Sequence, residues 1–213
     1  MPQTRFRARF GYWRCLHLSL VVAASLVPLS GQDPTDGNET LFSRAPSDWR
    51  AETFPFPLEF APDIDLEGVE ELRFAPGMLQ ADSENYFSYS FIWWLNGRVA
   101  TDHRMLRENL LLYYGGLYRA VSKQETKDTS SFAVQIRATR EPSWVAGAAQ
   151  SYRGSVSWID PFVTEKPLTL NLMIAQWYCE KKDRTAVYFL VSPQTMDHPI
   201  WTALRGMQAG PCE

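Results

Sequence analysis

The sequence has little histidine, few cysteines and none of the short motifs that mark well-known catalytic sites. Three of its 213 residues are His and three are Cys. Beyond the N-terminal region only His103 and His198 remain, so a Ser-His-Asp or Cys-His site would have to use one of them. The patterns G-x-S-x-G, H-E-x-x-H, G-x-G-x-x-G, C-x-x-C and the P-loop are absent. The sequence therefore leaves the catalytic residues unknown and favours a protein that is not an enzyme.

Metal-binding patterns are missing as well. The segment Asp63–Gly68 has acidic residues at its first, third and fifth positions and Gly at the sixth, as a calcium loop has. The twelfth position is Phe74, where such a loop needs a bidentate acid. The alternation of Ile64 and Leu66 with the acids also fits an edge strand entering a turn. We therefore expect no metal and no cofactor.

Long apolar runs are confined to the N-terminus. Residues 1–31 carry four arginines and no acid, and they include the apolar run Leu16–Leu29 followed by small residues. This arrangement is typical of a secretory signal peptide. The run is shorter than the ~20 residues that span a bilayer, although an uncleaved anchor is the alternative. We expect a signal peptide over 1–31 and a mature chain that is periplasmic or secreted, without stable membrane insertion.

Positive charge is scarce once the N-terminus is set aside. Without residues 1–31 the chain has 17 basic and 24 acidic residues, a net charge of −7. A chain this acidic has no general attraction to nucleic acid or to anionic lipid. The sequence also shows no run of Lys and Arg. We therefore expect no nucleic-acid partner.

Two cysteines, Cys179 and Cys212, remain after removal of the signal peptide. In an oxidising compartment a lone pair of this kind is a candidate disulfide. It would tie the C-terminal tail to a predicted strand. The alternative is a buried Cys179 and a free Cys212 in a frayed tail.

Aromatic residues are abundant and make up 14% of the chain. The stretch Asp82–Gly97 alternates between an apolar face, which includes Phe91 and Trp93, and a mixed face, which includes Trp94. A period of two and aromatic side chains are typical of a strand. We predict that this strand is the centre of the core, with its apolar face under a helix.

The remaining pattern predicts an α+β fold. Period-two alternation indicates strands at 69–75, 131–139, 151–160, 167–179 and 185–192, and spacings of three and four indicate a long helix over 101–123 and a short one after Pro199. Residues 32–48 are polar and aperiodic, which predicts a flexible linker, and the prolines of 49–62 predict an extended surface segment. Short loops favour antiparallel pairing. We expect a single domain over 49–213, an antiparallel sheet of about five to six strands with one long and one short C-terminal helix packed on it.

The adjacent tryptophans of the central strand suggest a binding site. Trp93 and Trp94 must point to opposite sides of the sheet. If one face is open, Trp94 and Tyr86 with Trp158 and Tyr152 from a neighbouring strand would line a cleft for a small apolar or sugar ligand. The alternative is that both faces are covered and these rings belong to the core.

Three functions remain open at this level. The sequence favours a secreted or periplasmic domain that binds a protein partner or a small ligand and is not an enzyme. The second is a carboxylate-dependent hydrolase that uses acids near Asp63–Glu71. The third is an accessory subunit of a cell-envelope complex.

Overall fold

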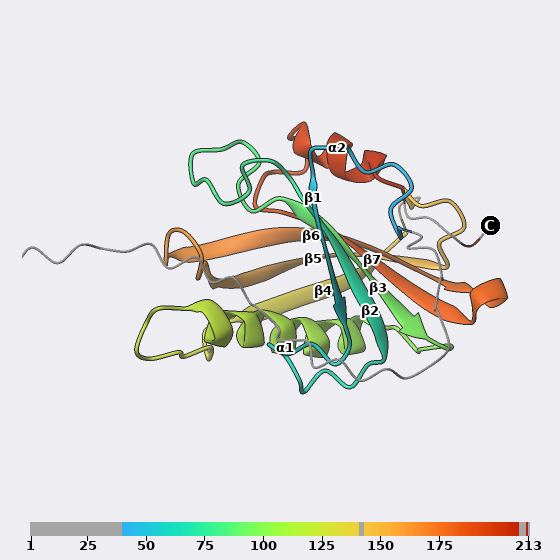
Figure 1. The fold of residues 1–213 in the computed structure, drawn as a ribbon, viewed down its shortest axis with the longest axis horizontal. Helices are drawn as coiled ribbons and strands as arrows, with labels where there is room; N and C mark the ends of the chain where they lie inside the picture. Colours follow the sequence, from blue (N-terminus) through green and yellow to red (C-terminus); the bar gives the residue numbers. More distant parts are fainter. Residues whose placement is uncertain (1–39, 141–142, 209–211, 213) are drawn as a thin grey trace, which may run out of the picture. The chain divides into compact units, whose positions relative to one another are not determined.

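The computed structural model describes residues 40–140, 143–208 and 212 (Figure 1). Within these residues the chain forms seven strands and two α-helices. The strands are β1 (Arg50–Pro55), β2 (Gly68–Phe74), β3 (Tyr89–Asn96), β4 (Ala133–Thr139), β5 (Gln150–Ile159), β6 (Pro167–Cys179) and β7 (Arg184–Ser192). The helices are α1 (His103–Val121) and α2 (Ile200–Gly206), and a 3-10 turn at Glu180–Lys182 joins β6 to β7. The predicted signal peptide lies outside the described residues.

All seven strands form one antiparallel sheet in the order β1-β2-β3-β7-β6-β5-β4. The predicted α+β class with one long and one short helix is confirmed. The sheet has one more strand than expected because part of the proline-rich segment pairs with β2 as the edge strand β1. Pro55 ends that strand, as suits a residue that cannot donate to a ladder.

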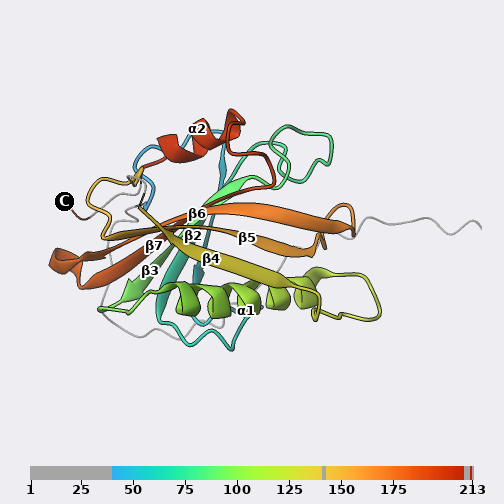
Figure 2. The same cartoon turned by 180° about the vertical axis from the view of Figure 1, so that it is seen from behind.

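The sheet lies between two covering layers (Figures 1 and 2). Helix α1 and the loop between β1 and β2 pack on one face, and their core includes Leu106, Leu110 and Leu58. Helix α2 and the segment before β1 pack on the other face, where Trp201 and Phe42 are buried. The domain thus has two apolar cores, one on each side of a shared sheet.

The aromatic strand divides its side chains between these cores as its alternation predicts. Phe91 and Trp93 are fully buried on the α1 side, and Ile92 and Trp94 pack on the α2 side. The predicted strand is shortened at its start, because residues 82–88 form turns and Phe87 has a positive φ of 50°.

The segment predicted as a flexible linker, residues 32–48, is packed on the sheet at two of its described residues. Leu41 and Phe42 are only 6% and 2% exposed and belong to the α2-side core. The backbone N–H of Leu41 donates to the carboxylate of Glu71, and the Arg73 guanidinium lies over the Phe42 ring at 4.9 Å. Leu41 and Phe42 are therefore packed rather than part of a flexible linker, because a short apolar pair within a polar stretch is enough to dock on the sheet. Most of the residues from 43 to 48 are exposed. Residues 32–39 lie outside the described residues.

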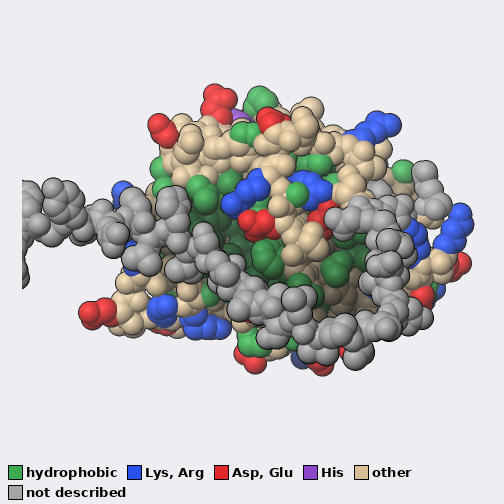
Figure 3. Space-filling view, in the orientation of Figure 1, with side chains coloured by type: hydrophobic (Ala, Val, Ile, Leu, Met, Phe, Trp, Pro, Cys, Tyr) green, Lys and Arg blue, Asp and Glu red, His purple; other side chains and the backbone are tan. Residues whose placement is uncertain are grey.

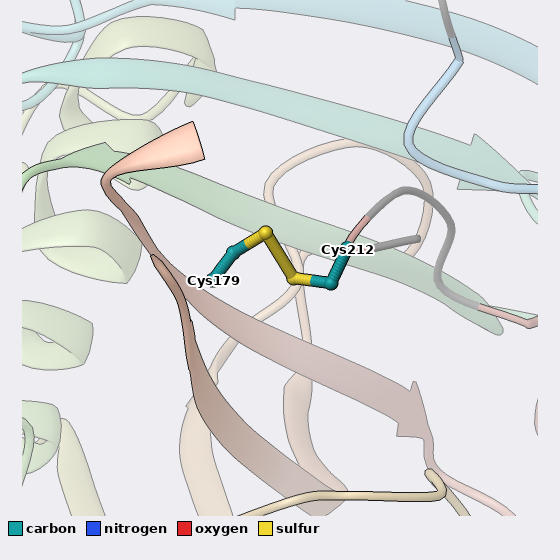
Figure 4. The surroundings of a disulfide bond; sticks show 2 residues. All are labelled: Cys179 and Cys212. Carbon is teal, nitrogen blue, oxygen red and sulfur yellow. A yellow bond between two sulfur atoms is a disulfide. The ribbon is translucent and has the colours of Figure 1, made fainter. Parts of the chain in front are cut away.

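Cys179, at the end of β6, forms a disulfide with Cys212, as predicted (Figure 4). The two Cα atoms are 5.4 Å apart. The bond fits an oxidising, extracytoplasmic compartment. Neither described helix combines the length and the apolar character needed to cross a membrane.

Replacement of the two adjacent glycines of α1 by alanine should affect stability to different extents. A Cβ atom on Gly116 would lie 2.1 Å from the carbonyl oxygen of Phe60, a backbone atom of the packed loop. A Cβ on Gly115 would meet only the side chain of Arg119, 3.4 Å away. We expect Gly116→Ala to lower the free energy of unfolding by at least about 2 kcal/mol. Gly115→Ala, the matched control, should change it by less than about 1 kcal/mol. Urea unfolding measures both, and equal effects would contradict the close approach.

The disulfide should make a large contribution to stability. It joins residues 33 positions apart in sequence. The chain-entropy model assigns a loop of this length about 3–4 kcal/mol. We expect Cys179→Ala/Cys212→Ala to unfold at a correspondingly lower urea concentration than the oxidised wild type. Wild type treated with reductant is the control and should behave like the variant.

Candidate functional site

The four residues predicted to line one cleft do not converge. Trp94 packs on the α2 side of the sheet, whereas Trp158 and Tyr152 are buried in the α1-side core. Tyr86 lies in the turn before β3, and its ring contacts Phe87, which in turn contacts Trp158. The Tyr152 hydroxyl donates to the backbone oxygen of Thr101 at 3.0 Å. The sheet therefore separates Trp94 from the other three residues, and the predicted shared cleft is not formed.

Strand register explains this difference. Trp94 stands opposite Ala186 of β7, which stands opposite Trp177 of β6. This row belongs to the α2-side face. On β6 the residue paired with Trp158 is Leu168, which packs on the α1 side. The periodicity of each strand divides its side chains into two faces, but only the pairing with its neighbours decides which face meets which core.

An apolar pocket lies instead near the β1 edge of the sheet, on the α1 side. Its volume is about 270 Å³, close to the lower end for small-molecule sites. Strands β1 to β3, helix α1 and the loops before β3 and after β5 all contribute to its wall. Seven aromatic side chains line it: Phe54, Phe60, Phe74, Phe87, Tyr89, Tyr113 and Phe162. Leu72, Met78, Leu79 and Leu117 complete the apolar surface, and Arg50 and Glu52 are its only charged lining residues among those described.

The rim of this pocket exposes large apolar side chains. Phe54, Leu79 and Phe162 are 38%, 43% and 41% exposed and are three of the five large hydrophobic side chains exposed in the described chain. Arg50 and Glu52 pair at 3.1 Å on β1. Figure 3 shows the molecule in the orientation of Figure 1, and hydrophobic side chains lie in hollows beside basic and acidic side chains near the middle of the view. Exposed apolar groups around a concavity are typical of a binding surface.

Asp160 holds the two loops that form part of the wall. Its carboxylate accepts from the Tyr86 hydroxyl at 2.6 Å and from the backbone N–H groups of Phe162 and Thr164 at 2.8 and 2.6 Å. Burial alone would raise the pKa of the Asp160 carboxyl, but these hydrogen bonds outweigh it and lower that pKa. The backbone N–H of Phe162 donates to this charged carboxylate. This hydrogen bond fixes the loop and thereby positions the Phe162 ring at the pocket.

A buried carboxyl, Glu70, lies behind the aromatic wall. Its side chain is fully buried and accepts from the indole N–H of Trp93 at 2.9 Å and from the Tyr113 hydroxyl at 3.4 Å. Burial raises the pKa of Glu70 from 4.5 to about 8; the two hydrogen bonds oppose the shift, and the charge of Glu52 adds to it. The carboxyl is therefore mostly protonated at neutral pH.

Other groups considered for catalysis lie apart. Glu70 and Glu71 are neighbours on β2 and face opposite sides of the sheet, so they do not form a carboxylate pair. Asp65 is exposed. His103 is exposed at the start of α1, and the Nδ1 atom of His198 accepts from the backbone N–H of Ile200 at the start of α2. Among the residues that the structure describes, no group of His, Cys, Asp and Glu has a metal-binding arrangement.

The sequence contained one signal for this region that the prediction did not use. The alternation of β2 slips at Glu70–Glu71, which places a buried acid on each face of the strand. An acid at an inward position indicates a buried polar network. No sequence pattern predicts that Phe162 and Leu79 are exposed, because both lie in loops, where apolar residues follow no period.

Comparison of the chain with protein-family models, with curated proteins and with solved structures found no match. The function must therefore be argued from the site itself.

The stability of the protein should fall as pH rises through the range in which Glu70 titrates. A carboxyl with a pKa of about 8 when folded and about 4.5 when unfolded binds more protons in the folded state between these values. We expect the free energy of unfolding to drop by on the order of 3 kcal/mol between about pH 5 and about pH 7.5. Glu70→Gln should remove this drop, whereas Glu59→Gln, which changes an exposed acid, should leave it. Urea unfolding across the pH range tests both variants, and an unchanged slope in Glu70→Gln would contradict the assignment.

Proposed function

We propose that the chain is a non-enzymatic binding domain of the periplasm or the extracellular space. Its ligand is a small, uncharged and mainly apolar molecule that enters the pocket at the β1 edge. The observation that carries this proposal is the gathering of exposed Phe54, Leu79 and Phe162 around one concave apolar surface. The localisation is supported by the Cys179–Cys212 disulfide and by the signal-like residues 1–31.

The charges of the pocket support an uncharged ligand. The two charged lining residues, Arg50 and Glu52, already pair with each other. Glu70 behind the wall is mostly protonated at neutral pH, since its pKa is about 8. A ligand carboxylate or ammonium would therefore lose its hydration inside the pocket and find no free charge of opposite sign to pair with. Aromatic walls instead favour a ring or a short acyl chain.

The uncharged fluorophore Nile red provides a direct test. We expect saturable binding by the wild type, with the blue shift that accompanies entry into an apolar site. Leu79→Ser/Phe162→Ser removes two exposed apolar side chains from the rim and should weaken binding at least about tenfold, because a loss of 1.4 kcal/mol has that effect.

A matched control is available in the same chain. Val121 and Val163 are each 37% exposed and do not line the pocket. Val121→Ser/Val163→Ser should therefore bind Nile red as the wild type does. Equal weakening in both double variants would indicate nonspecific adsorption to exposed apolar groups, and the absence of saturable binding by the wild type would falsify the proposal. Circular dichroism confirms that each variant is folded.

A further inference from the structure

Strand β1 forms an open edge of the sheet (Figure 1). It pairs with β2 on one side, and five of its six residues are exposed. The backbone N–H of Phe56, directly after the strand, donates to the carbonyl oxygen of Gly68 at 3.0 Å. Because backbone groups alternate in direction along an antiparallel strand, the even-numbered residues of β1 also direct theirs toward β2. The backbone groups of Ala51 and Thr53 therefore point away from the sheet.

These outward backbone groups have no partner in the described part of the chain. None of the backbone hydrogen bonds found there outside the helices and strands uses Ala51 or Thr53. The next outward position is Pro55, which has no N–H and closes that end of the edge to further pairing. A row of free donors and acceptors on an edge strand is a template for another strand. The edge at Ala51 and Thr53 therefore lacks one extended backbone.

The side chains of β1 carry both signs of charge on one face. Arg50 and Glu52 are two positions apart, so both point to the α1 side of the sheet, where they pair with each other at 3.1 Å. An antiparallel strand of the same sequence that places its Glu52 opposite Arg50 also places its Arg50 opposite Glu52. The exposed edge is therefore complementary in charge to a second copy of itself.

The two-fold registers centred on Ala51, Glu52 and Thr53 differ in the groups that they oppose. The Ala51 register sets the two Ala51 residues opposite each other, with hydrogen bonds in both directions, and each Arg50 opposite a Glu52. The Glu52 register sets the two Glu52 carboxylates opposite each other, which is destabilising. The Thr53 register sets Ala51 opposite Pro55, which cannot donate. The charge pattern and the proline together favour the register centred on Ala51.

We propose that two copies of the chain associate by antiparallel pairing of their β1 strands about Ala51, so that the sheet of one copy continues into the other. Arg50 and Glu52 of each copy then form an alternating row of four charges on the α1 side. Strand addition takes its affinity from main-chain hydrogen bonds. Because a six-residue strand is much shorter than the roughly 20 residues that each side of a standard interface contributes, the dimer is weak and reversible. The inference does not depend on the ligand of the apolar pocket.

Sedimentation equilibrium of the full chain between about 1 μM and about 1 mM tests the proposal, because weak complexes dissociate in this range. We expect a reversible monomer–dimer equilibrium for the wild type. Ala51→Pro removes the central N–H from each copy and should weaken association at least about tenfold. Since that N–H points away from β2, the ladder within the chain keeps its hydrogen bonds.

Ala51→Ser is the matched control, because it changes the same exposed side chain and keeps the N–H. It should associate as the wild type does. Circular dichroism of dilute samples establishes that each variant is folded. A wild type that stays monomeric at the highest concentration, or equal association by Ala51→Pro and Ala51→Ser, overturns the proposal.

Exchange of charge tests the register and the identity of the partner. Arg50→Glu alone opposes acids to acids across the pair, and Glu52→Arg alone opposes bases to bases. Each should weaken association at least about threefold in about 0.05 M salt, where screening is modest. An equal mixture of the two variants opposes unlike charges at both positions and should form a heterodimer about as tight as the wild-type dimer. A mixture that associates no better than the separate variants contradicts the proposed pairing.

Discussion

The pairing of β3 with β7 at the centre of the sheet is the constraint on which the rest of the domain depends. Phe91 and Phe189 stand opposite each other on the α1 side, and their rings stack at 4.2 Å. Ile92 and Tyr188 stand opposite each other on the α2 side, and both are buried. A slip of one residue would carry every side chain to the wrong core, so burial of both faces fixes the register. Because β2 pairs with β3 and β6 pairs with β7, this register also decides which side chains of β2 and β6 point to each core.

The hollows of the surface, the proposed apolar pocket among them, lie where this double covering ends. On the α1 side, the layer stops short of β1 and leaves the apolar pocket with its exposed Phe54. On the α2 side, the layer stops short of β4 and β5 and leaves the hollow with Arg137 and Arg153. The sheet separates the two, and their chemistry differs, one being aromatic and nearly neutral, the other polar and basic.

The adjacent acids of β2 show how the two faces accommodate the same charge in different ways. Glu70 loses its charge at neutral pH because burial raises its pKa to about 8, and it keeps hydrogen bonds from Trp93 and Tyr113. Glu71 forms an ion pair with Arg73 and accepts from the backbone of Leu41. Removing one partner of a buried ion pair is strongly destabilising. Because the Glu71 carboxylate also accepts from the backbone of Leu41, it ties the segment before β1 to strand β2.

Local patterns predicted most of the elements. The positions of β2, β4, β5, β6 and β7 and of both helices agree with the predicted ranges to within a few residues. The side chain of Asp102 caps α1, because it accepts hydrogen bonds from the backbone N–H groups of Arg104 and Met105. These features depend on hydrophobic period, capping and turn residues, which are encoded over a few neighbouring positions. The docking of Leu41 and Phe42 was missed because it depends on contacts with Glu71 and Arg73, far away in sequence.

The sequence by itself determined the class of fold and the order of its elements apart from β1, and it indicated the two cysteines that pair. It also divided the strand Asp82–Gly97 into two faces, with Trp93 and Trp94 on opposite sides. Only the tertiary structure decided which strands are neighbours and therefore which side chains meet. It separated Trp94 from Trp158, and it brought Arg137, Arg153 and Arg205 together although no basic run exists in the sequence. The physical reason is that a site forms from side chains of distant segments, and their convergence depends on register between strands rather than on the pattern within any one of them.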